Sequence, residues 1–544
     1  MSQSPPAFSD VAPVQLEHKA RMRILGAVMV GVFLAALDQT VVGTALPTII
    51  TQLHGNALYT WAITAYLLTS TISGPLYGKL SDLFGRRPIF LTGVSIFMVG
   101  SLLAGLSQEM WQLVAARGIQ GLGAGALFPI ALAVIGDLFS PSERGRYQGL
   151  FGAVFGLSIL VGPAIGGLIT DTIGWHWVFF FNLPIGAFVL YVVWRYLPSY
   201  HLGGDKPRID YVGAALFTGA LVPILVGLTN KQSADWTDFW VGGLMAIGAV
   251  VLLLFVLWES RAPEPIVPLG LFKLRTFTVS VMAVFLAAFG FFATVVFLPR
   301  WFQVVLGSSA TESGYQILPL LGGLIISAIA SGNIVSRTGR YRLLACVSLL
   351  TMALGLFLLT TLRADSSVPV MWLYMFITGL GVGPTFAIFT LIVQNGVRIE
   401  QLGTATSNLT FFQQVGGTVG LAITGTVFAQ TFAAELPGQF GMSQVPPEVL
   451  GAVAPGLTPN ALGTVGDMGG AILKGLPPEA QAVVTPFITD IVDAIYRAFS
   501  IATAATFVPG IITALIAAGL VLLLRDPDRR TTPVEGGHPV IIGG

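Results

Sequence analysis

Three observations in the sequence predict an all-α membrane protein. Of its 544 residues, 54% are hydrophobic and only 10% are charged, whereas soluble domains carry about 25% charged residues. Fourteen apolar runs are long enough to cross about 30 Å of hydrocarbon as helices. These runs lack the two-residue alternation of membrane β-barrel strands, so we expect every span to be helical.

The fourteen predicted spans occupy most of the chain. They cover residues 24–46, 59–78, 89–107, 111–137, 146–170, 175–195, 209–229, 239–259, 277–302, 313–335, 341–362, 370–396, 404–430 and 499–524. The polar tail before them, residues 1–23, ends in a basic cluster and lacks the short apolar core and cleavage site of a secretory signal. We therefore expect an uncleaved first helix.

Basic residues predict the orientation of the spans. If the N-terminus is cytoplasmic, most of the 27 Lys and Arg residues fall in inner loops and tails, as the positive-inside rule requires. The outer side then holds Lys231, Arg300, Arg363, Lys474 and Arg497. Both termini are expected in the cytoplasm. The long connection 431–498 then lies outside, either as short helices over the outer mouth or as a surface loop.

Composition argues against several function classes. The net charge of +1 favours neither nucleic acid nor acidic ligands. The single cysteine, Cys346, excludes an intrachain disulfide and a Cys-rich metal site. The five histidines show no metal-ligand spacing, and no Walker phosphate loop is present, so we expect neither a metal nor ATP as the energy source.

An internal repeat relates the two ends of the chain. "GKLSDLFGRRP" (78–88) follows the second span, and "GNIVSRTGRYR" (332–342) follows the tenth. Gly78, Gly85 and Arg86 align with equivalent residues in the second copy, and both loops are predicted to be cytoplasmic. Two halves that share direction are typical of transporters with parallel repeats, whose substrate site lies between the halves.

At these residues the chain resembles the major facilitator superfamily, and within it the fourteen-span drug:proton antiporters, which include bacterial multidrug exporters. Six segments carry the resemblance, in order and at the right spans. They are "LDQTVVGTALPTI" (37–49), "GKLSDLFGRRP" (78–88), "RGIQGLGAG" (117–125), "GLSILVGPAIGGLI" (156–169), "WHWVFFFNLPIG" (175–186) and "PIVPLGLFKLRTF" (265–277).

The resemblance implies a major facilitator fold of fourteen transmembrane helices in the bacterial inner membrane. It implies proton-coupled export of hydrophobic, cationic drugs by alternating access, with the proton gradient as the only energy source and no cofactor. We expect a monomer whose partners are protons, small hydrophobic substrates and membrane lipids. The organisation would be a tail (1–23), a six-helix half (24–200), two linking helices (201–265), a second six-helix half (266–524) and a cytoplasmic tail (525–544).

Asp38 is the candidate for proton coupling. It lies inside the first span, where an ionised carboxylate costs several kcal/mol and usually faces a cavity or marks an ion pathway. Arg117 is the only basic residue away from the ends of the predicted spans, so the two side chains would form a pair if they meet. The competing interpretation is a fixed pair that only holds two helices together.

The loop after the second span predicts a conformational latch. Asp82 can accept hydrogen bonds from a helix N-terminus or from the neighbouring arginines, and opening of the cytoplasmic side would break them. In the second copy Ser336 stands in place of Asp82, so we expect the stronger latch in the N-terminal half. The latch residues are Gly78, Asp82, Gly85, Arg86 and Arg87.

Glycines and a proline interrupt the fifth span. Their spacing puts small residues on one helix face, which lets another helix approach closely, and proline removes a backbone donor. In the functional interpretation, this face forms an interface along which the halves slide and which blocks proton leak. In the structural interpretation, it is only a tight contact between two helices. The resemblance assigns the antiporter motif to Gly156, Gly162, Pro163, Gly166 and Gly167.

The substrate region is expected to be apolar and aromatic. Such a site suits hydrophobic substrates, and aromatic faces can hold lipophilic cations. The candidate contacts are Trp61, Tyr66, Phe412 and Gln413. Further polar candidates are Gln316, Asn333, Gln394, Asn395, Asn408 and Gln414.

The same residues are also compatible with other functions. A lipid or lipophilic-metabolite exporter, or a proton symporter, could use the same fold, since fold does not fix function. The "GPAIGG" run argues against a symporter. A membrane enzyme would need clustered His, Asp or Ser side chains at one membrane face, and the sequence shows no such cluster.

Overall fold

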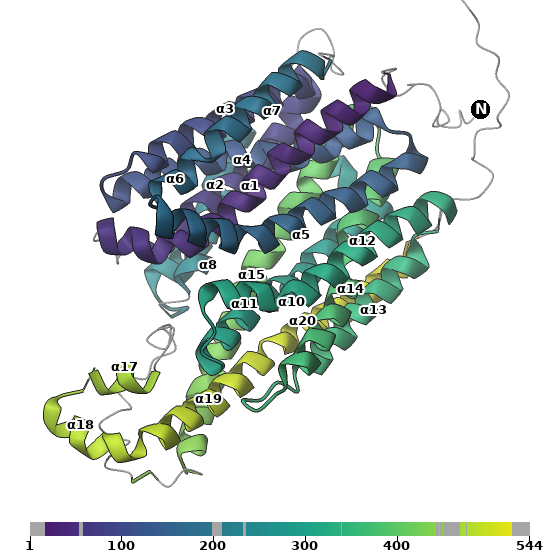
Figure 1. The fold of residues 1–544 in the computed structure, drawn as a ribbon. Helices are drawn as coiled ribbons and strands as arrows, with labels where there is room; N and C mark the ends of the chain where they lie inside the picture. Colours follow the sequence, from purple (N-terminus) through teal and green to yellow (C-terminus); the bar gives the residue numbers. More distant parts are fainter. Residues whose placement is uncertain are drawn as a thin grey trace, which may run out of the picture.

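The computed structural model is a bundle of long helices in two halves, and it describes residues 17–53, 58–198, 209–231, 235–338, 340–441, 445–446, 449, 468–474 and 476–524. Residues 1–16 of the predicted N-terminal tail, the whole predicted tail 525–544 and a part of the loop 431–498 therefore lie outside the described residues, while 18–23 already belong to the first helix. Figure 1 shows the N-terminal half in purple and blue beside the C-terminal half in green and yellow.

The N-terminal half consists of the helices that precede the first linking helix. They are α1 (His18–Leu53), α2 (Tyr59–Phe84), α3 (Arg86–Gly105), α4 (Met110–Leu138), α5 (Pro141–Thr172), the short α6 (His176–Phe180) and α7 (Asn182–Tyr196). Its core is formed by aliphatic and aromatic side chains of α1, α3, α4 and α7.

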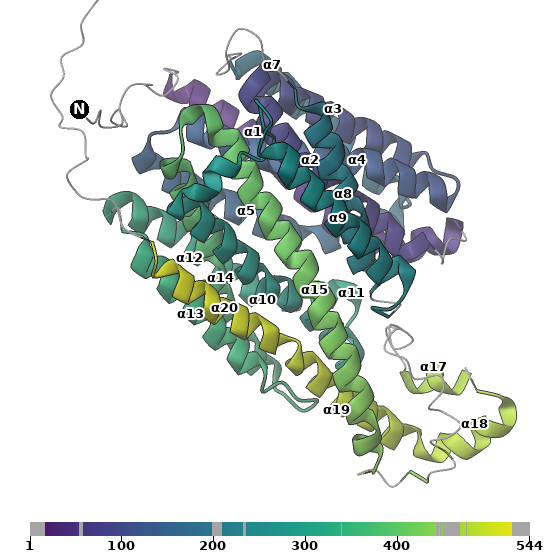
Figure 2. The ribbon, with the colours of Figure 1, turned by 180° about the vertical axis from the view of Figure 1, so that it is seen from behind.

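Two linking helices follow. They are α8 (Tyr211–Asn230) and α9 (Leu244–Glu259), which a π-helical turn, η2 (Phe239–Gly243), precedes. Both pack against each other, and α8 also contacts α2 and α15, one helix from each half. Figure 2, which turns the molecule round, shows α8 and α9 in front of the junction between the halves.

The C-terminal half has its own large apolar core. Its long helices are α10 (Arg275–Val305), α12 (Leu318–Thr338), α13 (Arg342–Leu359), α14 (Val368–Gly396), α15 (Leu402–Gly441), α19 (Ile488–Ala505) and α20 (Phe507–Val521). The shorter elements are η3 (Leu269–Lys273), α11 (Ala310–Gln316), η4 (Ile399–Gln401), α17 (Met468–Lys474), α18 (Pro478–Val484) and η7 (Thr485–Phe487). α15 and α19 extend into the predicted loop 431–498, and α17 and α18 lie between them.

Local sequence signals explain several helix boundaries. α5 begins with a capping box of Ser140 and Glu143, and α4 begins with one of Glu109 and Gln112, which satisfies backbone donors that the first turn leaves unpaired. Gly85 joins α2 to α3 with φ of 91°, a conformation that only glycine adopts without strain.

The all-α membrane fold is confirmed, while the number of crossings stays a prediction. Among the described residues, twelve helical stretches are long and apolar enough to span a membrane, and each overlaps a predicted span. α2 and α5 cover the other two predicted spans with 26 and 32 helical residues but are not among the twelve. In α2, the buried hydroxyls of Ser70, Thr71 and Ser73 reduce the apolar character of the helix.

Two pairs of helices make the most extensive contacts between the halves. α5 packs against α12, and α2 packs against α15. The loop between α2 and α3, the start of α5 and the start of α15 lie at the same end of the bundle, which we call the latch end.

Candidate functional site

Asp38 lies in the middle of α1 and is 2% exposed. Its Oδ2 accepts a hydrogen bond and ion pair from Arg117 Nη1 of α4. Its Oδ1 accepts from Gln120 Nε2 at 2.8 Å and from Asn182 Nδ2 at 2.9 Å. Both carboxylate oxygens are therefore occupied, and the structure brings together the two residues that the sequence analysis singled out.

Arg117 has further partners besides the carboxylate. Its Nη1 donates to Gln120 Oε1 at 2.7 Å, and its Nε donates to the carbonyl of Ala62 at 3.3 Å. Its guanidinium carbon lies 4.2 Å from the ring centroid of Tyr66, a cation–π contact. The guanidinium would therefore keep several partners if Asp38 were neutral.

The Asp38 site lies wholly inside the N-terminal half. Asn182 also donates to Ser101 Oγ of α3 at 2.9 Å, and Ser101 Oγ donates to the carbonyl of Phe179 at 2.9 Å. α1, α2, α3, α4, α6 and α7 thus all contribute, and within the described part of the second half no helix does. Because buried charges are costly unless paired, the neutral sum of Asp38 and Arg117 is what allows both to be buried.

The sequence analysis missed Gln120 and Asn182 as ligands of Asp38. Both lie inside quoted motifs, "RGIQGLGAG" and "WHWVFFFNLPIG". Each is a single carboxamide in an otherwise apolar run, and a polar residue within a membrane span usually has a partner inside the protein. That signal could have identified them.

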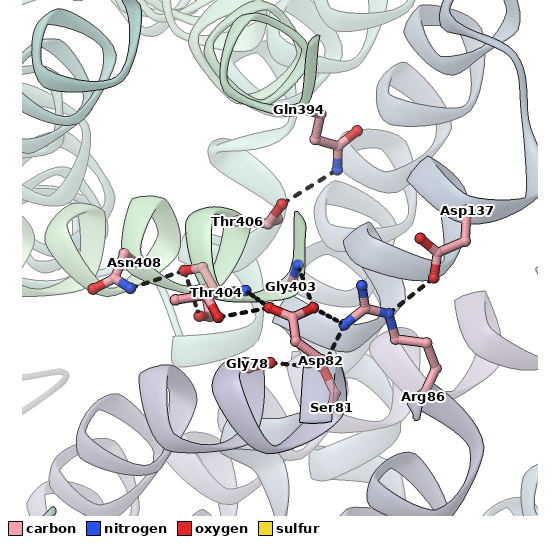
Figure 3. A network of polar contacts seen from close by, with 11 residues as sticks. Gly78, Ser81, Asp82, Arg86, Asp137, Gln394, Gly403, Thr404, Thr406 and Asn408 are labelled. Atoms are coloured by element: carbon pink, nitrogen blue, oxygen red, sulfur yellow. Dashed lines mark hydrogen bonds and ion pairs between the residues drawn. The ribbon is translucent and has the colours of Figure 1, made fainter. Parts of the chain in front are cut away.

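The second buried acid, Asp82, joins the two halves at the latch end (Figure 3). Its Oδ1 accepts from Arg86 Nη1 and from the backbone N–H of Gly403 at 3.0 Å. Its Oδ2 accepts from the backbone N–H of Thr404 at 2.7 Å and from Thr404 Oγ1 at 2.6 Å. Gly403 and Thr404 form the first turn of α15, where unpaired backbone donors favour an anion.

The predicted latch residues play different parts in this contact. Arg86, 1% exposed, also donates from Nε to Asp137 Oδ2 at 2.9 Å and from Nη1 to Ser81 Oγ at 2.7 Å. Arg87 makes no hydrogen bond or ion pair within the part of the chain that the structure describes. The side chain of Ser336, which replaces Asp82 in the second copy, lies outside the described residues.

Glycine is required where α2 crosses α15. A Cβ added at Gly78 would overlap Ser407 Oγ and would lie 2.8 Å from the carbonyl oxygen of Gly403. A Cβ on Gly403 would in turn lie 2.6 Å from Asp82 Oδ1. The backbones therefore come close enough for Asp82 to reach the N-terminus of α15.

Side-chain hydrogen bonds of Gln148 and Arg144 form a second contact between the halves at the latch end. Gln148 Nε2 of α5 donates to Gln394 Oε1 of α14 at 3.0 Å, and Gln394 Nε2 donates to the carbonyl of Leu132 in α4 at 2.9 Å. Arg144 Nη1 donates to Asn395 Oδ1 at 3.1 Å. Gln394 and Asn395, candidates for substrate contact from the sequence, thus lie in the interface between the halves.

The glycines of α5 face two different neighbours. Gly156 approaches α12 of the other half, with a Cβ position 3.0 Å from Ile325. A Cβ on Gly162 would instead overlap Thr40, and one on Gly166 would overlap Thr44, both on α1 of the same half. Gly167 is half-buried, and the side chain of Pro163 lies outside the described residues.

A cavity of about 10 Å³, room for about one water molecule, lies between the halves beside the Asp38 site. α1, α2 and α4 line it on one side and α15 lines it on the other. Its lining residues are Gln39, Ser70, Thr71, Gly74, Ala124, Gly125, Phe128, Pro129, Thr410, Phe411 and Gln414. None of the four predicted substrate contacts is among them: Tyr66 lies under Arg117, and Trp61, Phe412 and Gln413 are half-buried elsewhere.

Comparison with known proteins identifies the family to which this architecture belongs. Residues 28–421 match the family model of the Major Facilitator Superfamily. The chain is 39% identical to the multidrug transporter protein MdtP of Bacillus subtilis over 76% of each chain. It is 37% identical to multidrug resistance protein 3 of the same organism, over 77% of this chain and 81% of the relative.

A solved structure shows the same fold. The crystal structure of the human organic anion transporter MFSD10 superposes with a TM-score of 0.57 at 18% identity, over 75% of this chain and 94% of that one. The two helical halves agree with the family match over residues 28–421. The chain belongs to the major facilitator superfamily of membrane transporters.

Proposed function

We propose that this protein exports hydrophobic compounds across the bacterial inner membrane in exchange for protons. Similarity to two multidrug transporters supports drug efflux. The observation that carries proton coupling is the buried Asp38, paired with Arg117 inside an apolar bundle. Lipophilic cations as substrates are a prediction that the family resemblance alone supplies.

Protonation of Asp38 would change the charge of its surroundings. The ionised carboxylate and Arg117 sum to zero, whereas a protonated Asp38 leaves the guanidinium as a net positive charge. Gln120, the Ala62 carbonyl and the Tyr66 ring still hold that guanidinium. The half can therefore gain or lose a proton without losing its internal contacts, which suits an ion-coupling site.

Alternating access would place the latch end at the cytoplasmic face, together with both termini. Opening of that face separates Asp82 from Thr404 and Gln148 from Gln394, while contacts inside each half persist. Substrate would bind inside with Asp38 ionised. After the outward transition a proton binds Asp38, the substrate leaves, and the protonated form returns. The proton gradient drives this cycle with one chain as the transporting unit and no further cofactor.

Proton release from inside-out vesicles tests this proposal. Vesicles with an acidic interior receive a panel of hydrophobic compounds, and a pH-sensitive dye reports the loss of the gradient. We expect compounds to dissipate the gradient with the wild type and not with Asp38→Asn at equal abundance. Asp171→Asn is the matched control, because Asp171 is exposed at the far end of α5. Equal responses from wild type and Asp38→Asn would refute coupling through Asp38, and no response to any compound would refute drug export.

A further inference from the structure

We propose that Glu259, at the latch end of the linking helix α9, is a second proton-binding site, and that its proton controls how firmly the linking helices hold α2. The site lies outside the N-terminal half that contains Asp38. The inference goes beyond the proposed export function, and both of its tests are read without a transported compound.

Glu259 is buried with one carboxylate oxygen left without a donor. It is the last residue of α9 and is 3% exposed. Its Oε1 accepts a hydrogen bond from the backbone N–H of Val267 at 2.5 Å, and the N–H of Ile266 approaches the same carboxyl group. Its Oε2 is buried and makes no hydrogen bond within the described residues. Burial of a charged oxygen in this state is costly, whereas a proton on Oε2 removes the charge.

A second acid borders the same oxygen. A Cβ added at Gly213, in the first turn of α8, would overlap Asp210 Oδ2 and would lie 3.0 Å from Glu259 Oε2. Asp210 caps α8, since its Oδ1 accepts from the backbone N–H of Gly213 at 2.8 Å. Trp258 Nε1 also donates to Asp210, 3.0 Å from Oδ1 and 3.1 Å from Oδ2. These donors and the helix N-terminus stabilise negative charge on Asp210, so Glu259 is the acid that takes the proton.

Of the common cations, a proton fits this pair of acids best. Ca²⁺ takes about six to eight oxygen ligands, and the described residues contain no group of three or more His, Cys, Asp or Glu side chains that could hold a metal ion. Lys79 of α2 also acts on Glu259 electrostatically, but its Nζ is paired with Glu264 Oε2 at 2.6 Å. Two neighbouring carboxyl groups need only one proton, because like charges disfavour ionisation of both.

The segment between α9 and η3 connects this acid to the latch end of α2. It leaves α9 directly after Glu259 and is held to it again by the hydrogen bond from Val267. Between these two points Glu264 pairs with Lys79, which lies one helical turn before the latch residue Asp82. The same segment contributes to the apolar cluster that α2, α8, α9 and α15 share. A movement at Glu259 therefore reaches both halves.

Loss of the proton would loosen this connection. With Glu259 neutral, the two acids carry a single negative charge. Deprotonation places two negative charges beside Gly213, and their repulsion favours separation of α8 from the end of α9. The segment anchored on Glu259 moves with α9, so the ion pair between Lys79 and Glu264 is lost and α2 separates more easily from α15. A higher pH at the latch end thus favours its opening.

Infrared difference spectroscopy of the purified full-length protein tests proton binding. An ordinary glutamate is ionised above about pH 6, so a carboxyl band that persists above this pH and disappears as the pH rises reports a protonated buried acid. In an Asp38→Asn background, Glu259→Gln should remove one component of this band, and Asp210→Asn should shift its loss to lower pH. Glu17→Gln is the matched control, because Glu17 is exposed. A band that is equal with and without Glu259 would overturn the proton site.

The distance between the halves tests the control of α2. Spin labels at Thr92→Cys and Arg340→Cys, with Cys346 replaced by serine, report the open fraction at the latch end in the same Asp38→Asn background. From about pH 6 to about pH 8, this fraction should grow about threefold more with Glu259 than with Glu259→Gln, the size expected for a partly exposed ion pair. Equal pH responses in the two proteins would overturn the control of α2 by this acid.

Glu264→Gln separates proton binding from its effect on α2. It removes the ion pair with Lys79 and leaves Glu259 in place, so the infrared component should remain while the additional pH response of the distance disappears. The comparison with Glu259→Gln also cancels any contribution from Asp82, whose protonation at low pH would weaken the latch in every variant. An additional pH response that persists in Glu264→Gln would contradict the route through the segment between α9 and η3.

Discussion

Asp38 and Asp82 are both buried aspartates bound to an arginine, but their other partners differ. The Asp38 partners, Arg117, Gln120 and Asn182, belong to its own half. Asp82 instead accepts three hydrogen bonds from α15 of the other half, two from backbone N–H groups and one from Thr404 Oγ1. A rigid rotation of one half against the other therefore leaves the first site intact and breaks the second.

The difference fits the two tasks that we propose for these sites, proton coupling at Asp38 and a latch at Asp82. A proton site must keep its geometry while the protein changes shape, so its partners lie on helices that move together. A latch must lose its contacts when the shape changes, so its partners lie on helices that separate. Substitutions at the two sites should accordingly affect different properties, stability and proton coupling at Asp38, and the balance of conformations at Asp82.

The largest expected effect is that of Arg117→Ala on stability. It leaves the Asp38 carboxylate buried without its cation, and breaking a buried ion pair costs about 3–5 kcal/mol. Thermal unfolding of the purified protein measures the loss. Arg87→Ala should change little, because Arg87 has no ion pair within the described residues. The double variant Asp38→Asn/Arg117→Ala should recover much of the stability; a double variant as unstable as Arg117→Ala would argue against the charge pair as the cause.

The next effect is that of Asp82→Asn on conformation. Hydrogen bonds to a charged group contribute about 1.5–3 kcal/mol each, so the latch end should open in a much larger fraction of molecules. Spin labels at Thr92→Cys and Arg340→Cys, both exposed at the latch end, report the distance between the halves once Cys346 is replaced by serine. An unchanged distance distribution would show that Asp82 does not hold the halves together.

Gly78→Ala should open the latch end without removing a charge. The added methyl group overlaps Ser407 Oγ, and overpacking of this kind costs about 1–3 kcal/mol. The same pair of spin labels measures the separation. Gly26→Ala is the control, because a Cβ there meets nothing within 4 Å. Equal distance distributions in both variants would contradict the close approach of α2 to α15.

The smallest expected effect is that of Gln148→Leu. It removes one uncharged hydrogen bond to Gln394, which contributes about 1 kcal/mol, so the closed population should fall only a few-fold. A shift as large as that of Asp82→Asn would mean that the carboxamide contact, and not the charged one, dominates the latch.

Two different signals in the sequence identified the two acids as candidates. Asp38 is an acid within an apolar span, and Asp82 lies in a repeated loop motif. The helical fold followed from length and hydropathy alone. Partners such as Thr404 were not predictable, because they lie more than three hundred residues away in sequence and only packing of the halves brings them to Asp82.

The lining of the cavity illustrates the same limit of sequence-based prediction for a single residue. Gln413 and Gln414 are neighbours of the same type on one helix, and neither composition nor periodicity tells which one faces the other half. Successive residues point about 100° apart round a helix, so the choice of face depends on the rotation of α15 against α2. The structure places Gln414, and not Gln413, in the wall of the cavity.

Proton release on substrate binding tests the separation of the two sites. Purified wild type, Asp38→Asn and Asp82→Asn in weakly buffered detergent solution each receive a compound that the vesicle assay identifies as exported. Binding of substrate and proton are reciprocally linked, so wild type and Asp82→Asn should release protons in proportion to the compound bound, and Asp38→Asn should release none. Release that persists in Asp38→Asn, or that disappears in Asp82→Asn with substrate still bound, would contradict a proton site contained within the N-terminal half.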